Sequence, residues 1–344
     1  MASRINKRYV LAARPTGGAT QGEFGSGNLT ISQAEVPALN DGELLYRTIM
    51  VSVDPYQRNI MGNTTSETPP LQIGQTMVGP AVGVVEESRN SAFSVGDHVV
   101  SWSGWQQYVV STGVGLRKLD ESIAPLSTAL GVLGHTGLTA WLGASKLMEP
   151  KPGGTFVVTN AAGSVGTTAA QLAKRRGHRV VGIAGGEQKV AYLRDELGLD
   201  AALDYKAETF QSDLEHALPD GVDRLLDSVG GGLFELLLPR FNVQSKVITI
   251  GQMRMYGPEA NELRTDRLPD LLNLILYRKV EVRGMQLNEY FNLYPEFLAE
   301  MTPLVASGEI KYREEFVDGF ENIPGSLARL FAGHNQGKLI VRIG

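Results

Sequence analysis

The stretch Thr155–Lys189, TFVVTNAAGSVGTTAAQLAKRRGHRVVGIAGGEQK, decides the fold of this chain. It opens with Thr155–Asn160, a short β-branched apolar run of the length of a buried strand. A turn of small residues, Ala161–Gly166, leads into Thr167–Arg176, which has Ala and Leu at helical spacing and a basic last turn. A second β-branched run, His178–Ile183, follows. Strand, glycine turn, helix and strand in this length predict a βαβ unit of the dinucleotide-binding kind.

The turn in this unit has the residues that a pyrophosphate site needs. Backbone N–H groups at the positive end of a helix hold pyrophosphate, and a side chain there would keep the backbone away from the phosphate. In the fingerprint G-x-G-x-x-G, this chain has Ala161 in the first place, then Gly163 and Gly166. A tight turn that binds nothing is the alternative, since a chain with 40 glycines produces such turns by chance. The flanking strand and helix favour the nucleotide site.

The end of the second strand indicates which dinucleotide is bound. Cofactors without a 2′-phosphate are usually held by an Asp or Glu about 20 residues after the glycines. Here the strand ends in Ile183–Gly186 without a carboxylate, and Lys189 follows. Small residues and a cation leave room and charge for a 2′-phosphate, so we predict NADP(H) rather than NAD(H). Glu187 argues against this, and a solvated helix residue is the alternative for Lys189.

Composition and charge exclude several classes of function. The 344 residues, 42% hydrophobic and 20% charged, are typical of an ordinary globular protein with room for two domains. A net charge of −5 argues against nucleic acid as a partner. The longest apolar candidate, Leu271–Tyr277, is far too short to span a membrane, so we expect a cytoplasmic protein without a membrane partner. With no cysteine and no paired spacing among five histidines, we expect no metal site.

Three regions follow one another along the chain. Residues 1–125 have short β-branched runs between Gly, Pro and Asn, which predict a small β-barrel. Residues 126–294 alternate helices and strands, and their six β segments predict a doubly wound parallel sheet. Residues 295–344 change composition again, and we expect them to complete the barrel. The strands expected in the barrel are Tyr9–Ala13, Leu44–Val53, Met77–Glu86, His98–Trp102 and Tyr108–Val110.

Several motifs together resemble one family. They are SVDPYQR at 52–58, SGWQQY at 103–108, AAGSVG at 161–166, AGGEQKVAYL at 184–193, LDYK at 203–206, DSVGG at 227–231 and HNQGK at 334–338. The combination resembles the zinc-independent medium-chain dehydrogenase/reductases, and within them the branch of prostaglandin, plant alkenal double-bond and bacterial curcumin reductases. The resemblance covers nearly the whole chain. It implies a Rossmann domain with a GroES-like β-barrel, in a homodimer.

The resemblance also implies a reaction and a set of cofactor contacts. The family uses NADPH to reduce the C=C bond of α,β-unsaturated ketones and aldehydes, so it implies NADP(H) as cofactor and a small enone as substrate. Gly163–Gly166 would cradle the pyrophosphate, and Lys189 with Tyr205 would meet the 2′-phosphate. The full set of implied cofactor contacts is Gly163, Ser164, Val165, Gly166, Gly186, Lys189, Tyr205, Ser228, Gly251, Met285, Leu287 and Asn335.

Two tyrosines complete the implied site. Tyr256 falls where the family has a tyrosine near the reacting enone, and Tyr56 falls on the family's DPYMR tyrosine, which flanks the substrate pocket. Hydride transfer to the β-carbon leaves an enolate, which a phenol O–H and a cofactor ribose hydroxyl can stabilise and protonate. A packed aromatic is the alternative role for Tyr56. The alternative functions are a quinone reductase, which needs no such tyrosine, and a cofactor-binding protein with little turnover.

Overall fold

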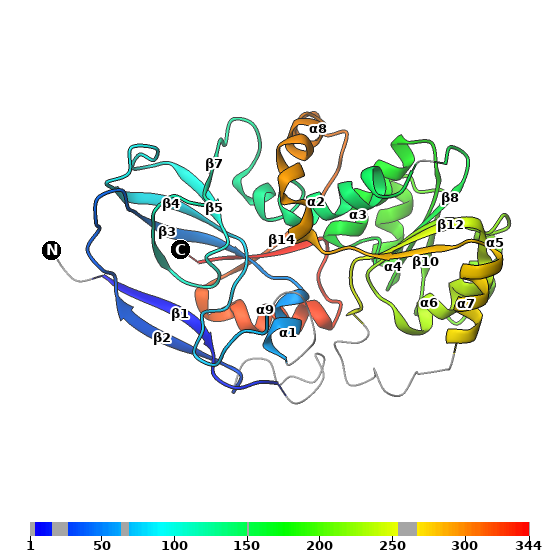
Figure 1. Cartoon of the computed structure of the whole chain (residues 1–344), viewed down its shortest axis with the longest axis horizontal. Coiled ribbons are helices and arrows are strands. Elements are labelled where there is room, and N and C mark those ends of the chain that lie inside the picture. The colour runs from blue at the N-terminus through cyan, green and yellow to red at the C-terminus, as the bar shows by residue number, and fades with distance from the viewer. Residues whose placement is uncertain (1–3, 16–26, 63–68, 150, 254–266, 344) are drawn as a thin grey trace. The chain divides into compact units, whose positions relative to one another are not determined.

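The computed structural model describes residues 4–15, 27–62, 69–149, 151–253 and 267–343. The chain forms two compact units, Met1–Gly131 with Glu314–Gly344, and Val132–Arg313 (Figure 1). Residues 295–313, which the sequence analysis grouped with the barrel, lie in the second unit. The reason is helix α8, Tyr294–Ala306, whose Phe297 ring packs edge-on against Trp141 with the ring centroids 6.0 Å apart.

The described part of the second unit is built on a six-stranded parallel sheet in the order β10-β9-β8-β11-β12-β13. In chain order this is 3-2-1-4-5-6, the arrangement of a Rossmann fold. The prediction of a doubly wound parallel sheet is therefore confirmed. The strands are β8 Thr155–Thr159, β9 Arg179–Ala184, β10 Ala201–Asp204, β11 Val222–Asp227, β12 Phe241–Thr249 and β13 Glu281–Gly284.

The central strands of this sheet are continuous apolar runs because helices cover both faces of such a sheet. Val157 of β8, Val181 of β9 and Leu225 of β11 are fully buried in one core cluster. After Gly186 the chain forms helix α4, Glu187–Ala191, which continues as a π-helical turn at Tyr192–Glu196. The other helices are α2 His135–Trp141, α3 Ser164–Arg175, α4 Glu187–Ala191, α5 Phe210–Ala217, α6 Gly231–Leu237 and α7 Leu268–Tyr277.

The first unit is a separate, largely antiparallel β structure, so the second part of the fold prediction is also confirmed. In its described residues, strands follow the order β14-β15-β3-β4-β5-β7, β6 also pairs with β3, and β1 and β2 form a ribbon. The strands are β1 Ile5–Leu11, β2 Leu29–Glu35, β3 Leu44–Ser52, β4 Ala81–Ser88, β5 His98–Ser101, β6 Tyr108–Ser111, β7 Arg117–Leu119, β14 Glu314–Asp318 and β15 Lys338–Arg342; the helices are α1 Tyr56–Met61 and α9 Ile323–Phe331.

Two features of this unit differ from the sequence-based expectation. Strands β2 and β7 were not predicted, because β2 is mostly exposed and β7 is only three residues long, so neither has the apolar alternation of a half-buried strand. The carboxyl-terminal segment does join the barrel. Strand β15 pairs antiparallel with β3 and parallel with β14, and Leu339 and Val341 enter the same core as Leu11 and Trp105.

Candidate functional site

The turn between β8 and α3 explains why alanine replaces the first glycine of the fingerprint. The residue that takes a left-handed backbone is Asn160, with φ of 50°, and Asn tolerates this region better than most residues. Ala161 is fully buried and donates its N–H to the carbonyl of Ile183 at 2.9 Å. The first position of the fingerprint therefore needs a small residue here, and it does not need glycine.

Gly166 is required by close packing. An added Cβ would lie 2.3 Å from the carbonyl oxygen of Asn160 and 2.7 Å from Cα of Ala161, and both are backbone atoms that cannot rotate away. At Gly163 the nearest atom would be the Asn160 side-chain Nδ2 at 2.8 Å, which can move. The third glycine thus sets how closely α3 approaches the end of β8.

The amino terminus of α3 is suited to an anion. The first N–H bonded inside the helix at this end is that of Thr167, which donates to Gly163 at 2.9 Å. The N–H groups of Ser164, Val165 and Gly166 therefore precede the helical ladder, and no side chain of the described residues caps them. A helix of this length has a partial positive charge at this end, which attracts phosphate. The predicted pyrophosphate residues thus form one uncapped helix terminus.

The ends of β9 and β10 bring the residues predicted for the 2′-phosphate to one edge of the sheet. The parallel register pairs Asp204, the last residue of β10, with Ala184, the last residue of β9, so the segments that follow the two strands begin side by side. The Tyr205 ring lies against Gly185, where an added Cβ would be 2.7 Å from the ring carbon Cε1. Lys189 is half-buried on α4, just after Gly186.

The charges at this edge favour an anionic group. The nearby carboxylate, Asp204, accepts the backbone N–H groups of Gly186 and Lys206, both at 2.9 Å. Glu187 is exposed and lies 3.9 Å from a guanidinium nitrogen of Arg194. Lys206, which the sequence analysis did not select, places its ammonium 5.9 Å from the centroid of the Tyr205 ring. Its position directly after Tyr205 in LDYK was the signal that could have identified it.

A buried carboxylate joins the ends of β8 and β11. Asp227 is 1% exposed and accepts the hydroxyl of Thr159 at 2.8 Å and the N–H groups of Val229 and Gly230 at 3.1 Å each. Burial raises the pKa of Asp227, although these hydrogen bonds act in the opposite direction. The Ser228 N–H donates to the same Thr159 hydroxyl at 2.9 Å. Asp227 therefore orders the turn that holds Ser228.

The remaining predicted residues of the second unit follow the last two strands. An added Cβ at Gly251 would lie 3.2 Å from the carbonyl oxygen of Ser228, so this loop passes close to the β11 turn. Met285 is buried and donates its N–H to Thr249 at 3.1 Å, and Leu287 begins a 3-10 helix. Tyr256, the predicted catalytic residue, lies outside the described residues.

In the first unit, Tyr56 is the first residue of α1. Its ring lies beside that of Trp102, with the centroids 6.3 Å apart. Burial, and then the negative charge of Asp54, raises the pKa of Tyr56 well above its usual value. The phenol is therefore neutral and keeps its O–H as a donor at physiological pH. An added Cβ at Gly79 would lie 2.5 Å from Nε2 of Gln57 and 3.2 Å from the Tyr56 hydroxyl, so glycine leaves the room that these two side chains need.

Asn335, the other predicted residue of this unit, lies in the turn before β15. It is 9% exposed, and its Nδ2 donates to the carbonyl of Gly337 at 2.9 Å. The amide is therefore held in one orientation by its own turn. The structure thus places the predicted site residues in two groups, one at the carboxyl edge of the parallel sheet and one in the β unit at Tyr56 and Asn335.

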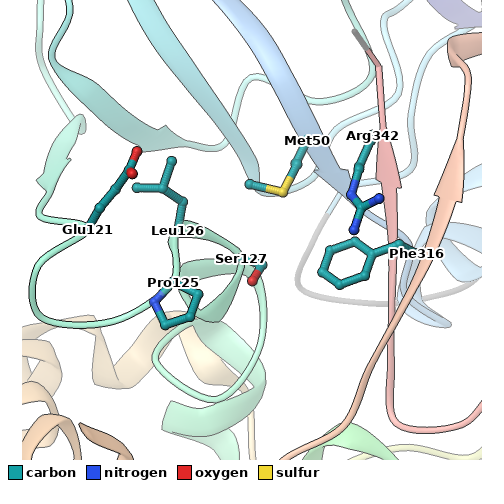
Figure 2. Close-up of a pocket in the computed structure, with 7 residues that line it drawn as sticks. All are labelled: Met50, Glu121, Pro125, Leu126, Ser127, Phe316 and Arg342. Carbon is teal, nitrogen blue, oxygen red and sulfur yellow. The ribbon is translucent and has the colours of Figure 1, made fainter.

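A separate pocket of about 390 Å³ lies in the first unit (Figure 2). Arg342 and Phe316 form one wall, with the guanidinium 4.0 Å from the centroid of the ring. None of the residues that line the pocket belongs to the predicted site. They are Met50, Glu121, Pro125, Leu126, Ser127, Phe316 and Arg342.

The described residues lack two features that would bear on function. No three His, Cys, Asp or Glu side chains come together there in a way that could hold a metal ion. In the same residues, no helix has both the length and the apolar character needed to cross a lipid bilayer.

A Rossmann sheet with an uncapped glycine turn, joined to a mostly antiparallel β unit, defines a dinucleotide-binding protein of two units. Two family models agree: one described as the N-terminal domain of oxidoreductase matches residues 7–119, and one described as zinc-binding dehydrogenase matches residues 164–303. The NADPH-dependent curcumin reductase of Escherichia coli is 38% identical over 98% of this chain and 97% of its own length.

Two further similarities have the same extent. The NADP(+)-dependent 2-alkenal reductase of Nicotiana tabacum is 31% identical over 98% of this chain and 97% of its own length. The crystal structure of CurA in complex with NADPH from Vibrio vulnificus superposes with a TM-score of 0.90, at 36% identity over 98% of this chain and 99% of that one. The chain belongs to the zinc-independent medium-chain dehydrogenase/reductases, in the branch of curcumin, prostaglandin and alkenal reductases.

Proposed function

We propose that the protein is an NADPH-dependent reductase of the C=C bond in small α,β-unsaturated ketones and aldehydes. The observation that carries the proposal is the carboxyl edge of β9, where the Tyr205 ring lies against Gly185, Lys206 is 5.9 Å from that ring, and Lys189 follows on α4. One oxygen of the Asp204 carboxylate accepts two backbone N–H groups there. Such an edge suits a 2′-phosphate and disfavours the unphosphorylated ribose. The names of the relatives, which include a curcumin reductase and a 2-alkenal reductase, support the substrate class.

The residues divide the work between the two units. When bound, NADPH supplies a hydride. The turn Gly163–Gly166 holds its pyrophosphate through the N–H groups of Ser164, Val165 and Gly166, and Lys189 with Tyr205 holds the 2′-phosphate. The proposed contacts along the rest of the cofactor are Gly186, Ser228, Gly251, Met285, Leu287 and Asn335.

Two phenols serve the substrate. Tyr256 donates a hydrogen bond to the carbonyl oxygen as negative charge collects there, and supplies or relays the proton. Tyr56 flanks the substrate, and its raised pKa keeps it a neutral donor. Neither role requires a metal ion or a covalent nucleophile, which is consistent with a chain that lacks cysteine.

The direct test is NADPH oxidation, followed at 340 nm, with a panel of enones, quinones and saturated alcohols or ketones. We expect turnover with 2-alkenals and enones, a saturated carbonyl product, and a strong preference for NADPH over NADH. Fast quinone reduction without turnover of any enone would assign the protein to the alternative quinone reductase. Tight NADPH binding with no turnover would assign it to the low-activity cofactor-binding class.

The proposal includes a homodimer formed through the outer edge of the parallel sheet. Strand β13 ends the sheet, and its four residues are exposed. On the preceding helix α7, Leu272, Leu276 and Tyr277 are 55%, 67% and 75% exposed, an unusual apolar surface for a monomer. Pairing of two such edges would cover both features. Light scattering tests this, and Leu276→Asp should yield monomers; a monomeric wild type would contradict the proposed dimer.

We also place the enzyme in the cytoplasm, which cell fractionation tests.

A further inference from the structure

The first unit, which contains the predicted site residues Tyr56 and Asn335, also contains a buried ion pair. Nζ of Lys338 is 2.9 Å from Oδ1 of Asp54, and the side chains are 3% and 5% exposed. The ammonium also donates to the carbonyls of Val53 at 2.9 Å and Leu339 at 3.2 Å. The second carboxylate oxygen accepts the hydroxyl of Ser52. All three donors of the ammonium and both carboxylate oxygens are therefore used.

The position of the pair follows from the register of the sheet. Strands β3 and β15 run antiparallel, with Ile340 opposite Ser52. Continued by two residues, this register places Lys338 opposite Asp54, at the point where both segments leave the ladder. The N–H of Val53 still donates to the carbonyl of Leu339 at 3.3 Å. The ion pair thus joins Asp54, two residues before α1 begins, to the first residue of β15.

Each member of the pair is close in sequence to a predicted site residue. On one side, the N–H of Asp54 donates to Oε1 of Gln57 at 2.9 Å, and Nε2 of Gln57 donates to the carbonyl of Val78 at 3.1 Å. The first of these bonds closes the turn Asp54–Gln57, which includes Tyr56. On the other side, Asn335 donates to the carbonyl of Gly337, the residue directly before Lys338. Short, hydrogen-bonded segments therefore connect the two site residues to the buried ion pair of Asp54 and Lys338, which we call the lock.

Stability alone does not account for such a pair. Removing two charges from water is costly, and apolar residues of similar size often replace a buried ion pair without loss of stability. What an apolar pair cannot do is bind carbonyls from two separate chain segments at once. The ammonium does this, since its acceptors lie on both Val53–Asp54 and Leu339.

We propose that Asp54 and Lys338 are positioning residues that hold Tyr56 and Asn335 in a fixed relation to each other. The inference rests on the proposed function, because it assigns Asn335 to the cofactor and Tyr56 to the substrate. It adds to that function two residues that touch neither ligand. The expected consequence of removing the lock is a folded protein in which Asn335 no longer contributes to NADPH binding.

The test is a double-mutant cycle read by NADPH binding, followed by the fluorescence of the bound dinucleotide. Asn335→Ala in the wild-type protein should raise the Kd by about tenfold, the loss of one well-oriented hydrogen bond. In the Asp54→Leu/Lys338→Met background, which should fold with a Tm near that of the wild type, the same Asn335→Ala change should alter the Kd by less than about twofold. The lock replacement alone should raise the Kd by about the same tenfold.

Several outcomes would overturn the proposal. An undiminished Asn335→Ala effect in the lock-replaced background means that the ion pair does not position the amide. No Asn335→Ala effect in the wild type means that there is no amide contact to position. If the double replacement does not fold, Asp54→Asn is the second variant. Its amide keeps an oxygen acceptor, which favours folding, but it removes the carboxylate charge that holds the ammonium, so it should still shrink the Asn335→Ala effect.

A matched control is available in the same unit. Lys118 and Asp97 form an exposed pair, 2.6 Å apart and 49% and 26% exposed, so Asp97→Leu/Lys118→Met removes the same charges at the surface. This control should leave both the Kd and the Asn335→Ala effect unchanged, and a change would contradict a role specific to the buried pair. Because binding is measured without turnover, failure of enone reduction and failure of the positioning role give separate results.

Discussion

Replacing Gly166 by alanine tests the geometry of the proposed cofactor turn. The new Cβ would lie 2.3 Å from the carbonyl oxygen of Asn160 and 2.7 Å from Cα of Ala161, so α3 must move away from β8. Overpacking of this kind costs about 1–3 kcal/mol. Alanine recovers about 0.5–1 kcal/mol of helix propensity. At the middle of these ranges the net loss is about 1.2 kcal/mol, which corresponds to a Tm lower by about 2–5 °C in a unit of this size.

The same movement displaces the N–H groups that hold the pyrophosphate. A loss of binding energy of similar size raises the KM for NADPH by about tenfold. Differential scanning fluorimetry and initial-rate kinetics measure both effects. The matched control is Gly232→Ala in α6, where no atom lies within 4 Å of the added Cβ and the variant should be slightly more stable. A Gly166→Ala protein with wild-type Tm and KM would refute the close approach of α3 to β8.

Three other changes test separate parts of the site. Lys189→Ala should raise the KM for NADPH by about 10–100-fold, through loss of a charged hydrogen bond, and leave that for NADH almost unchanged; equal effects would show that Lys189 does not bind the 2′-phosphate. Tyr256→Phe should lower kcat by about 100-fold with unchanged NADPH affinity, and wild-type turnover would remove it from the mechanism. Burial raises the pKa of Asp227, so as the pH falls the folded protein binds a proton at this carboxyl before the unfolded chain does. The free energy of unfolding of the wild type, relative to that of Asp227→Asn, should therefore rise as the pH falls from 7 to 4 in urea titrations. A difference between the two proteins that is independent of pH would contradict this.

How much of the fold the sequence predicts depends on the range of the interactions involved. The strands of the parallel sheet are apolar runs bounded by glycine turns, and this local pattern placed β8 and β9 within a residue or two of their ends. Strand β2 has no such pattern, because its pairing with β1 holds it while most of its side chains remain exposed. Helix α8 has an ordinary helical sequence, and its place in the second unit depends on the distant Trp141.

The site shows the same limit. The glycine turn and Lys189 could be proposed from the sequence because they lie within one βαβ unit. The bond from Thr159 to Asp227 joins residues 68 apart, and that from Lys338 to Asp54 joins residues 284 apart, so no spacing in the sequence announces either one. Such contacts require the register of the sheet, since the residues involved become neighbours only when separate strands pair.

The way the carboxylates are used connects these contacts to the choice of cofactor. Asp204 binds the backbone N–H groups of Gly186 and Lys206, and Asp227 binds those of Val229 and Gly230. In the first unit, Asp54 is paired with Lys338. Asp204 and Asp227 therefore order turns of the second unit, and Asp54 pairs with an ammonium. A carboxylate that accepts N–H bonds keeps its charge, but the N–H dipoles oppose its field at short range, so we expect Asp204 to repel a nearby phosphate less than an unbonded acid would. We therefore expect the preference for a phosphorylated dinucleotide to depend on the binding of this acid to backbone as well as on Lys189.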